Sequence, residues 1–153
     1  MIRPARLIEA GVIGLIIPLH FTMSAALGAA LGNPWVGNTL FQFVGAAVSV
    51  LIARGELTGE ISGRIRSTPR WLWLGGAISA AGILGTTILI PHIGAGNFQT
   101  LFVFAGISSG TVISHFGFLS SPVARINLIR VAGIIIMGIG AALAILGRIP
   151  FVD

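Results

Sequence analysis

The sequence predicts an all-α membrane protein with five transmembrane helices, and three observations predict it together: composition, the length of the apolar runs, and the placement of arginine. Of the 153 residues, 55% are hydrophobic and only 8% are charged. Soluble domains carry about 25% charged residues, so a chain of this composition cannot cover its apolar side chains with a polar surface. A bilayer solvates those side chains directly, and helices can cross it because each one satisfies its own backbone hydrogen bonds.

Five apolar segments are long enough to cross a bilayer, which takes about 20 helical residues. They lie at about 7–31, 35–53, 71–90, 98–119 and 126–147. Stretches rich in Gly, Asn, Ser and Pro separate them and indicate helix ends. The first run is too long for the apolar core of a signal peptide, so we expect it to remain as the first helix. Residues 54–70 form the longest connection, with room for at most a short surface helix. We expect residues 1–153 to form a single transmembrane domain.

The arginines predict the orientation of these helices. With five spans, the N-terminus, the second connection and the fourth connection share one side of the membrane. That side holds eight arginines, counting one that reaches it from the last helix: Arg3, Arg6, Arg54, Arg64, Arg66, Arg70, Arg125 and Arg130. The other side holds only Arg148. Since arginine and lysine collect in cytoplasmic loops, we expect a cytoplasmic N-terminus and an external C-terminus.

Composition also excludes several classes of function. The net charge of +5 would suggest nucleic-acid binding in a soluble protein, but cytoplasmic loops explain it here, so we expect no nucleic-acid partner. The chain has no cysteine, which excludes disulfides, thiolate metal sites and a cysteine nucleophile. We expect no cofactor and no metal site.

Polar side chains within the apolar helices are the candidates for solute binding. His20 and Ser24 lie in the first helix, and an ionisable group near the middle of a span indicates a functional site. Asn38 and Gln42 lie four residues apart on one face of the second helix. Each of these side chains has an alternative role, because polar groups also join membrane helices at about 0.6 kcal/mol per hydrogen bond.

The predicted fourth helix carries a central polar stretch from which we select Ser108 and Thr111. Hydroxyls of this kind can bond to carbonyls of their own helix, so they do not require a ligand. The same helix holds His115, and a serine–histidine pair would suggest an enzyme. Ser108 and His115 lie about 10 Å apart along the helix, too far for a nucleophile and its base. An intramembrane enzyme is therefore only a distant third function.

The order of several short motifs resembles the YdcZ-type family of small bacterial membrane proteins, in the drug/metabolite transporter superfamily. The resemblance covers nearly the whole chain and is carried by these motifs: Pro18-x-His20…Ser24-x-x-Leu27-Gly28, Phe43-x-Gly45, Trp71-x-Trp73-x-Gly75-Gly76, Pro91-x-x-Gly94-Ala95, Ala105-Gly106, His115-Phe116-Gly117 and Arg130-x-x-Gly133.

The resemblance implies five helices per chain in the bacterial inner membrane, assembled as an antiparallel pair that transports a small molecule. Two oppositely inserted chains would recreate the inverted repeat on which alternating access depends. This chain has His20 and Ser24 where the family tends to have glutamine and asparagine. It also has Ile107 where the family tends to have glutamine, and Ser114 where the family tends to have an acid.

We therefore expect a subunit of a secondary transporter that moves a small organic solute without enzymatic chemistry. The rival hypothesis is a membrane scaffold or accessory subunit whose polar residues only bind partner helices. The arginine bias favours an oppositely oriented homologous subunit as partner, and an antiparallel homodimer is the alternative.

Overall fold

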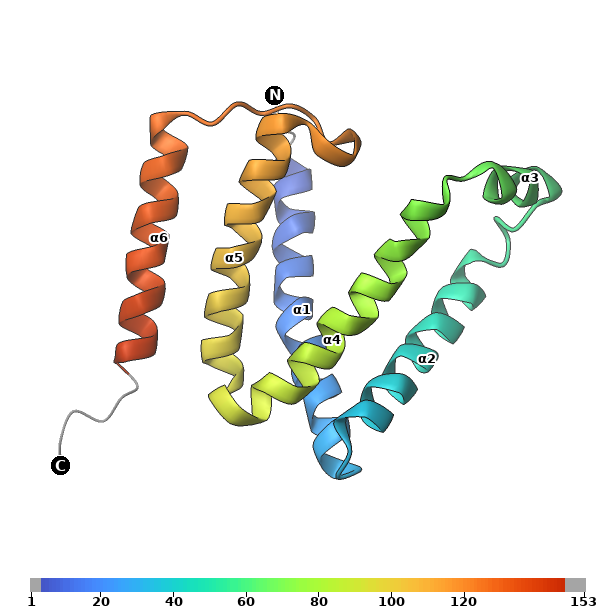
Figure 1. Cartoon of the computed structure of the whole chain (residues 1–153), viewed down its shortest axis with the longest axis horizontal. Helices are drawn as coiled ribbons and strands as arrows, with labels where there is room; N and C mark the ends of the chain where they lie inside the picture. Colours follow the sequence, from blue (N-terminus) through green and yellow to red (C-terminus); the bar gives the residue numbers. More distant parts are fainter. Residues whose placement is uncertain (1–3, 148–153) are drawn as a thin grey trace. The chain divides into compact units, whose positions relative to one another are not determined.

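A computed structural model describes residues 4–147, and these residues are helical apart from short connections. The long helices are α1 (Pro4–Ala30), α2 (Pro34–Ala53), α4 (Leu74–Ile93), α5 (Ala95–Phe116) and α6 (Leu128–Leu146) (Figure 1). Three short ones complete the described chain: α3 (Gly59–Ser67) and the 3₁₀ turns η1 (Arg70–Trp73) and η2 (Phe118–Ser120). The described residues contain no strand, which confirms the all-α class.

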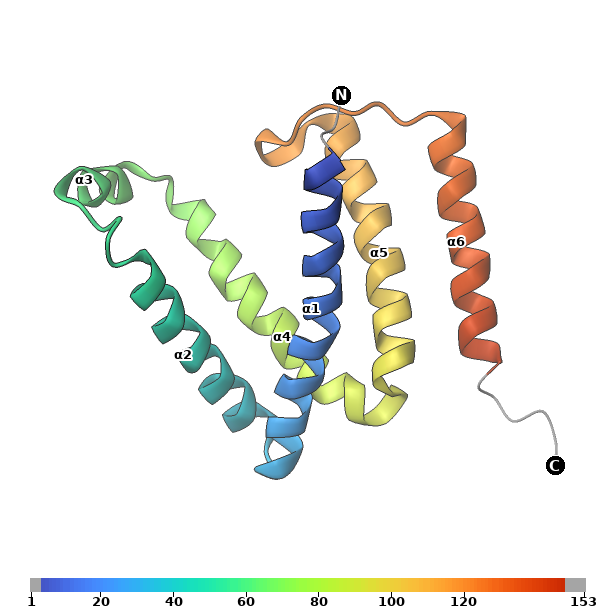
Figure 2. The ribbon, with the colours of Figure 1, turned by 180° about the vertical axis from the view of Figure 1, so that it is seen from behind.

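The helix ends follow local capping chemistry. Asn33 begins α2, because its Oδ1 accepts hydrogen bonds from the backbone N–H groups of Trp35 (3.0 Å) and Val36 (3.2 Å). Within the 54–70 connection, α3 forms a nine-residue helix with an exposed Arg64–Glu60 ion pair of 2.6 Å. This length agrees with the limit of one short helix that the sequence set for this connection. Figure 2 shows the tight turn that joins α1 to α2.

Several predicted boundaries differ by a few residues from those of the structure. The helix predicted for 98–119 ends at Phe116, because Gly117 takes a left-handed conformation (φ +66°) that terminates it. The helix predicted from residue 126 begins at Leu128, after Asn127 caps it. The helix predicted to stop before Pro91 continues through that proline to Ile93. A proline in the last turn disrupts only the end of the hydrogen-bond ladder.

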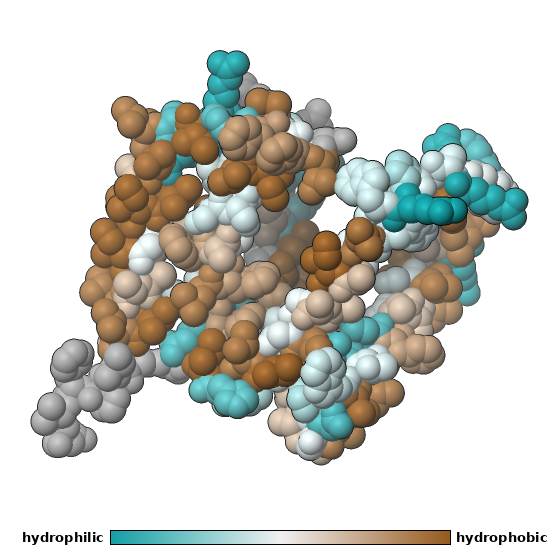
Figure 3. Space-filling view, viewed as in Figure 1, coloured by the Kyte–Doolittle hydropathy of each residue, from teal (hydrophilic) through white to brown (hydrophobic). Residues whose placement is uncertain are grey.

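Four helical stretches are long and apolar enough to cross a membrane: α1 from Arg6, α2, η1 with α4, and α6. Their apolar side chains are widely exposed, as shown by Leu15 and Ile52 at 79% each. In the space-filling view of Figure 3, brown side chains run along α6 while teal ones gather at α3. Helix α5 has 22 residues but is not among the four, because Asn, Gln, Thr, Ser and His side chains interrupt its apolar composition.

The structure divides into two compact units, residues 1–92 and 93–153. In the first, α1 and α2 form an antiparallel hairpin. They approach most closely at two glycines, where a Cβ added to Gly37 would lie 2.5 Å from the Gly28 Cα. A Cβ at Gly28 would in turn meet the Thr87 side chain of α4 at 2.5 Å. Only hydrogen fits at these positions, so glycine permits the contact.

In the second unit, α5 and α6 pack together and residues 117–127 connect them. Two hydrogen bonds tie this connection to the end of α5. The Ala124 N–H donates to the Ser114 carbonyl oxygen (2.9 Å), and the Ile126 N–H donates to Nδ1 of His115 (3.1 Å). The connection therefore has a defined path over the end of α5.

Candidate functional site

His20 is half-buried in the middle part of α1, and aromatic rings surround it. Its ring meets that of Phe41, from α2, edge-on at a centroid distance of 4.8 Å. The ring of Phe21 lies at 5.5 Å, also edge-on. No hydrogen bond to the His20 ring is recorded within residues 4–147. The side chain is thus positioned by aromatic packing.

Ser24 lies one turn further along α1 and is completely buried. Its Oγ is 2.8 Å from Oγ1 of Thr87 on α4. The Thr87 hydroxyl donates its proton to the carbonyl oxygen of Ile83 (2.9 Å), so Ser24 must be the donor between the two hydroxyls. Ser24 therefore joins α1 to α4 within the first unit.

Asn38 on α2 has an incompletely satisfied amide. It is 9% exposed, and its Nδ2 donates to the Ala80 carbonyl oxygen of α4 at 3.5 Å, a long hydrogen bond. Its Oδ1 is buried and has no hydrogen-bond partner within the described part of the chain. A buried, unpaired acceptor costs about 1–3 kcal/mol, so this oxygen is suited to receive an N–H or O–H from outside the chain.

Gln42 is half-buried one turn beyond Asn38 on the same helix. The first unit thus holds four of the predicted residues, with His20 and Ser24 on α1 and Asn38 and Gln42 on α2. The contacts recorded for three of them run between helices, from His20 to Phe41 of α2 and from Ser24 and Asn38 to Thr87 and Ala80 of α4. The cluster is defined here as His20, Ser24, Asn38 and Gln42.

The other two predicted residues belong to the second unit, on α5. The Ser108 hydroxyl donates to the Phe104 carbonyl oxygen (2.8 Å), and the Thr111 hydroxyl donates to that of Ile107 (2.8 Å). Both protons are therefore used within the helix, as sequence reasoning allowed. Thr111 also lines a pocket of about 300 Å³ between α5 and α6.

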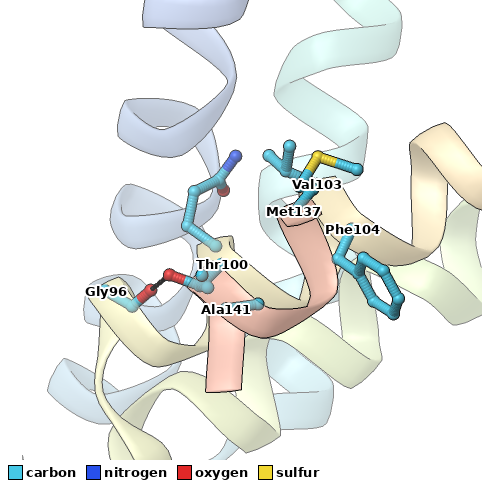
Figure 4. Close-up of a pocket in the computed structure, with 8 residues that line it drawn as sticks. Gly96, Thr100, Val103, Phe104, Met137 and Ala141 are labelled. Carbon is cyan, nitrogen blue, oxygen red and sulfur yellow. Dashed lines mark hydrogen bonds between the residues drawn. The ribbon is translucent and has the colours of Figure 1, made fainter. Parts of the chain in front are cut away.

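A larger pocket of about 540 Å³ lies between α5 and α6 and is open on one side. Figure 4 shows its apolar wall of Val103, Phe104 and Met137, with the Thr100 hydroxyl donating to the Gly96 carbonyl oxygen at 2.9 Å. The full lining is Gly96, Gln99, Thr100, Val103, Phe104, Met137, Gly140 and Ala141. An apolar pocket with a few polar groups is the usual form of a small-molecule site.

Sequence reasoning missed Gln99 and Thr100, which supply the polar side chains of this pocket. The sequence prediction started this helix at residue 98, which placed Gln99 and Thr100 at a helix end. With the helix starting at Ala95, Gly96, Thr100 and Phe104 follow at intervals of four and share one face. That spacing is the signal that could have found Thr100.

The described residues hold no group of three or more His, Asp or Glu side chains that could bind a metal ion. The chemistry of both sites is that of hydrogen bonding and apolar contact. Such sites recognise a solute, a lipid or another helix.

Comparison with protein families gives one match over nearly the whole chain. A family model described as "Putative inner membrane exporter, YdcZ" matches residues 6–143. No curated protein and no solved structure matches the chain. With several apolar helices, the match identifies a multi-pass protein of the inner membrane, and the chain belongs to the YdcZ family of inner-membrane exporters.

Proposed function

We propose that the chain is one subunit of a secondary transporter that exports a small organic solute by alternating access. The observation that carries the proposal is the family match over residues 6–143. The polar cluster and the α5–α6 pocket support it, because both place hydrogen-bonding groups inside helices that are otherwise apolar. Transport of this kind makes and breaks no covalent bond.

The proposed topology has five spans, with α5 as the fifth and the N-terminus in the cytoplasm. At a rise of about 1.5 Å per residue, the 22 residues of α5 reach about 33 Å, enough for the hydrocarbon core. If α5 crosses, Arg125 and Arg130 return to the side that holds the arginines of 54–70. The positive-inside rule favours that arrangement.

Single cysteines at Asn97 and Ser121, at the two ends of α5, test this topology. The chain has no native cysteine, so no background has to be removed. Five spans predict that an impermeant maleimide labels Asn97→Cys from outside the cell and Ser121→Cys only from the cytoplasmic side. Labelling of both positions from the same side would refute α5 as a span.

The proposed assembly is an antiparallel pair with an oppositely oriented homologous subunit. One chain can supply both orientations only when its arginine bias is small, because the bias sets insertion. The sequence places eight arginines on the cytoplasmic side of the predicted topology and one on the other side. Two of these nine, Arg3 and Arg148, lie outside the described residues. An antiparallel homodimer is the alternative. Efficient cross-links between opposite ends of two chains, in membranes lacking any other family member, would favour the homodimer and refute the partner.

The proposed solute contacts are the polar cluster together with Ser108 and Thr111. The unpaired Oδ1 of Asn38 is the strongest support, because it lacks a donor that a solute could supply. The Ser24–Thr87 hydrogen bond favours the rival function, a scaffold whose polar residues bind helices to one another.

Thermal unfolding of the purified protein with a panel of small organic solutes separates the two functions. A ligand that binds the native state raises the unfolding temperature by mass action. The transporter proposal predicts at least one stabilising solute whose effect is lost in Asn38→Ala and Gln42→Ala. A scaffold predicts no stabilising solute, either for the chain alone or for the chain with its partner.

A further inference from the structure

The smaller pocket between α5 and α6 contains a positive charge that neither helix neutralises. Its volume is about 300 Å³, and it is lined by Ile107, Thr111, Arg130, Gly133, Ile134 and Met137. Arg130 is the only charged residue in this lining. The pocket therefore combines apolar walls with one guanidinium and one hydroxyl.

Two sets of hydrogen bonds hold Arg130 in place. Its Nη1 donates to the Ala124 carbonyl oxygen (3.2 Å), and Ala124 is itself fixed to α5 through its N–H and the Ser114 oxygen (2.9 Å). Its backbone N–H donates to Oδ1 of Asn127 (2.8 Å), the cap of α6. A guanidinium has five N–H donors, so most of those of Arg130 remain free for a ligand.

No carboxylate among residues 93–147 pairs with this charge, since these residues contain neither Asp nor Glu. The ion pairs recorded among the described residues are Arg6–Glu9 and Arg64–Glu60, both in the first unit. Arg130 is also in the first turn of α6, where the helix dipole is positive and a cation is unfavourable. The guanidinium and the helix end thus both attract negative charge.

We propose that this pocket binds the anionic group of an amphiphile, a carboxylate or a phosphate attached to an apolar body. Arg130 donates hydrogen bonds to the anion, as guanidinium groups do for carboxylates and phosphates. Thr111, whose hydroxyl proton is donated to the carbonyl oxygen of Ile107, lies in the lining beside the guanidinium. Ile107, Ile134 and Met137 contact the apolar body.

The larger pocket extends the room for that apolar body. Met137 lines both pockets, so they are neighbours along the α5–α6 pair. The apolar tail of a ligand whose anionic group binds at Arg130 can extend past Met137 toward Val103. Both a free amphiphilic anion and a membrane lipid with an anionic headgroup fit this chemistry. The inference is independent of transport, because it concerns binding at equilibrium.

The test measures thermal unfolding of the purified full chain in dodecyl maltoside with four additives. Decanoate is the free carboxylate and decanol its uncharged counterpart. Phosphatidylglycerol is the anionic lipid and phosphatidylcholine its zwitterionic counterpart. We expect decanoate, phosphatidylglycerol or both to raise the unfolding temperature, and the two uncharged or zwitterionic counterparts to have little effect. Stabilisation by decanoate alone assigns the pocket to a free anion, and stabilisation by phosphatidylglycerol alone assigns it to a lipid headgroup.

Three variants locate the effect. Arg130→Gln removes the guanidinium and should raise the half-saturating concentration about tenfold or more. Arg125→Gln removes the same charge from the neighbouring connection and should leave that concentration unchanged. Gly133→Leu keeps the charge but fills the pocket, and a Cβ at Gly133 has no heavy atom within 4 Å, so the helix should tolerate it. This variant should also weaken binding about tenfold.

The proposal is overturned if neither anion stabilises the chain, or if decanol and phosphatidylcholine act as strongly as the anions. Equal losses in Arg125→Gln and Arg130→Gln would indicate diffuse surface charge in place of a site. If Arg130→Gln does not fold, Gly133→Leu decides the question alone. Unchanged binding in that variant would place the anion elsewhere.

Discussion

Replacing Gly37 by alanine tests the packing that joins the first two helices. The added Cβ would lie 2.5 Å from the Gly28 Cα and 2.7 Å from its backbone nitrogen. Carbon atoms in contact prefer about 3.5–4.0 Å, so α1 and α2 must separate by about 1 Å. The obstacle is backbone, which cannot rotate away as a flexible side chain would. Overpacking of this kind costs about 1–3 kcal/mol.

The assay is unfolding in mixed micelles of dodecyl maltoside and sodium dodecyl sulfate, followed by loss of helical circular dichroism. Gly37→Ala should unfold at a lower mole fraction of dodecyl sulfate, with a free energy of unfolding reduced by about 1–3 kcal/mol. Gly45→Ala is the matched control on the same helix, because no heavy atom lies within 4 Å of a Cβ placed there. It should change stability by no more than about 0.5 kcal/mol. Equal stability of the two variants would refute the close contact at Gly37.

Two further predictions concern the polar cluster. Thr87→Val should destabilise the protein more than Ser24→Ala, because it leaves the buried Ser24 hydroxyl without its recorded partner. In Ser24→Ala, by contrast, the Thr87 proton keeps its hydrogen bond to the Ile83 carbonyl oxygen. The expected difference in the free energy of unfolding is about 0.5–1 kcal/mol in the same micelle assay, and the reverse order would contradict the assigned donor. His20→Phe should keep the aromatic contact with Phe41 and the unfolding temperature, while losing the shift caused by a stabilising solute; a retained shift would remove His20 from the binding site.

Much of the fold could be predicted because its signals are local. A run of about 20 apolar residues specifies a membrane helix, and Asn33 specifies where α2 begins. One error occurred where a stop signal was incomplete. Pro91 was expected to end a helix, but α4 continues for two residues beyond it.

The candidate site was less predictable, because composition does not say which neighbour a polar side chain will find. Ser24 was selected to line a cavity, and in the first unit it bonds to Thr87, a residue 63 positions away. Thr100 was not selected, because its importance depends on α6 lying opposite. Both outcomes depend on contacts between distant segments, which periodicity along a single helix does not contain.

The central claim, alternating access, can be tested without knowing the solute. Met137 lines both pockets of the α5–α6 groove, and the chain has no native cysteine. Met137→Cys can therefore be treated with an impermeant maleimide in intact cells and, separately, in inside-out vesicles. Its neighbour Ile136 is 69% exposed and lines neither pocket, so Ile136→Cys is the lipid-facing control and should stay unlabelled. Alternating access predicts labelling of Met137→Cys from both sides of the membrane, and labelling from one side only, or from neither, would contradict it.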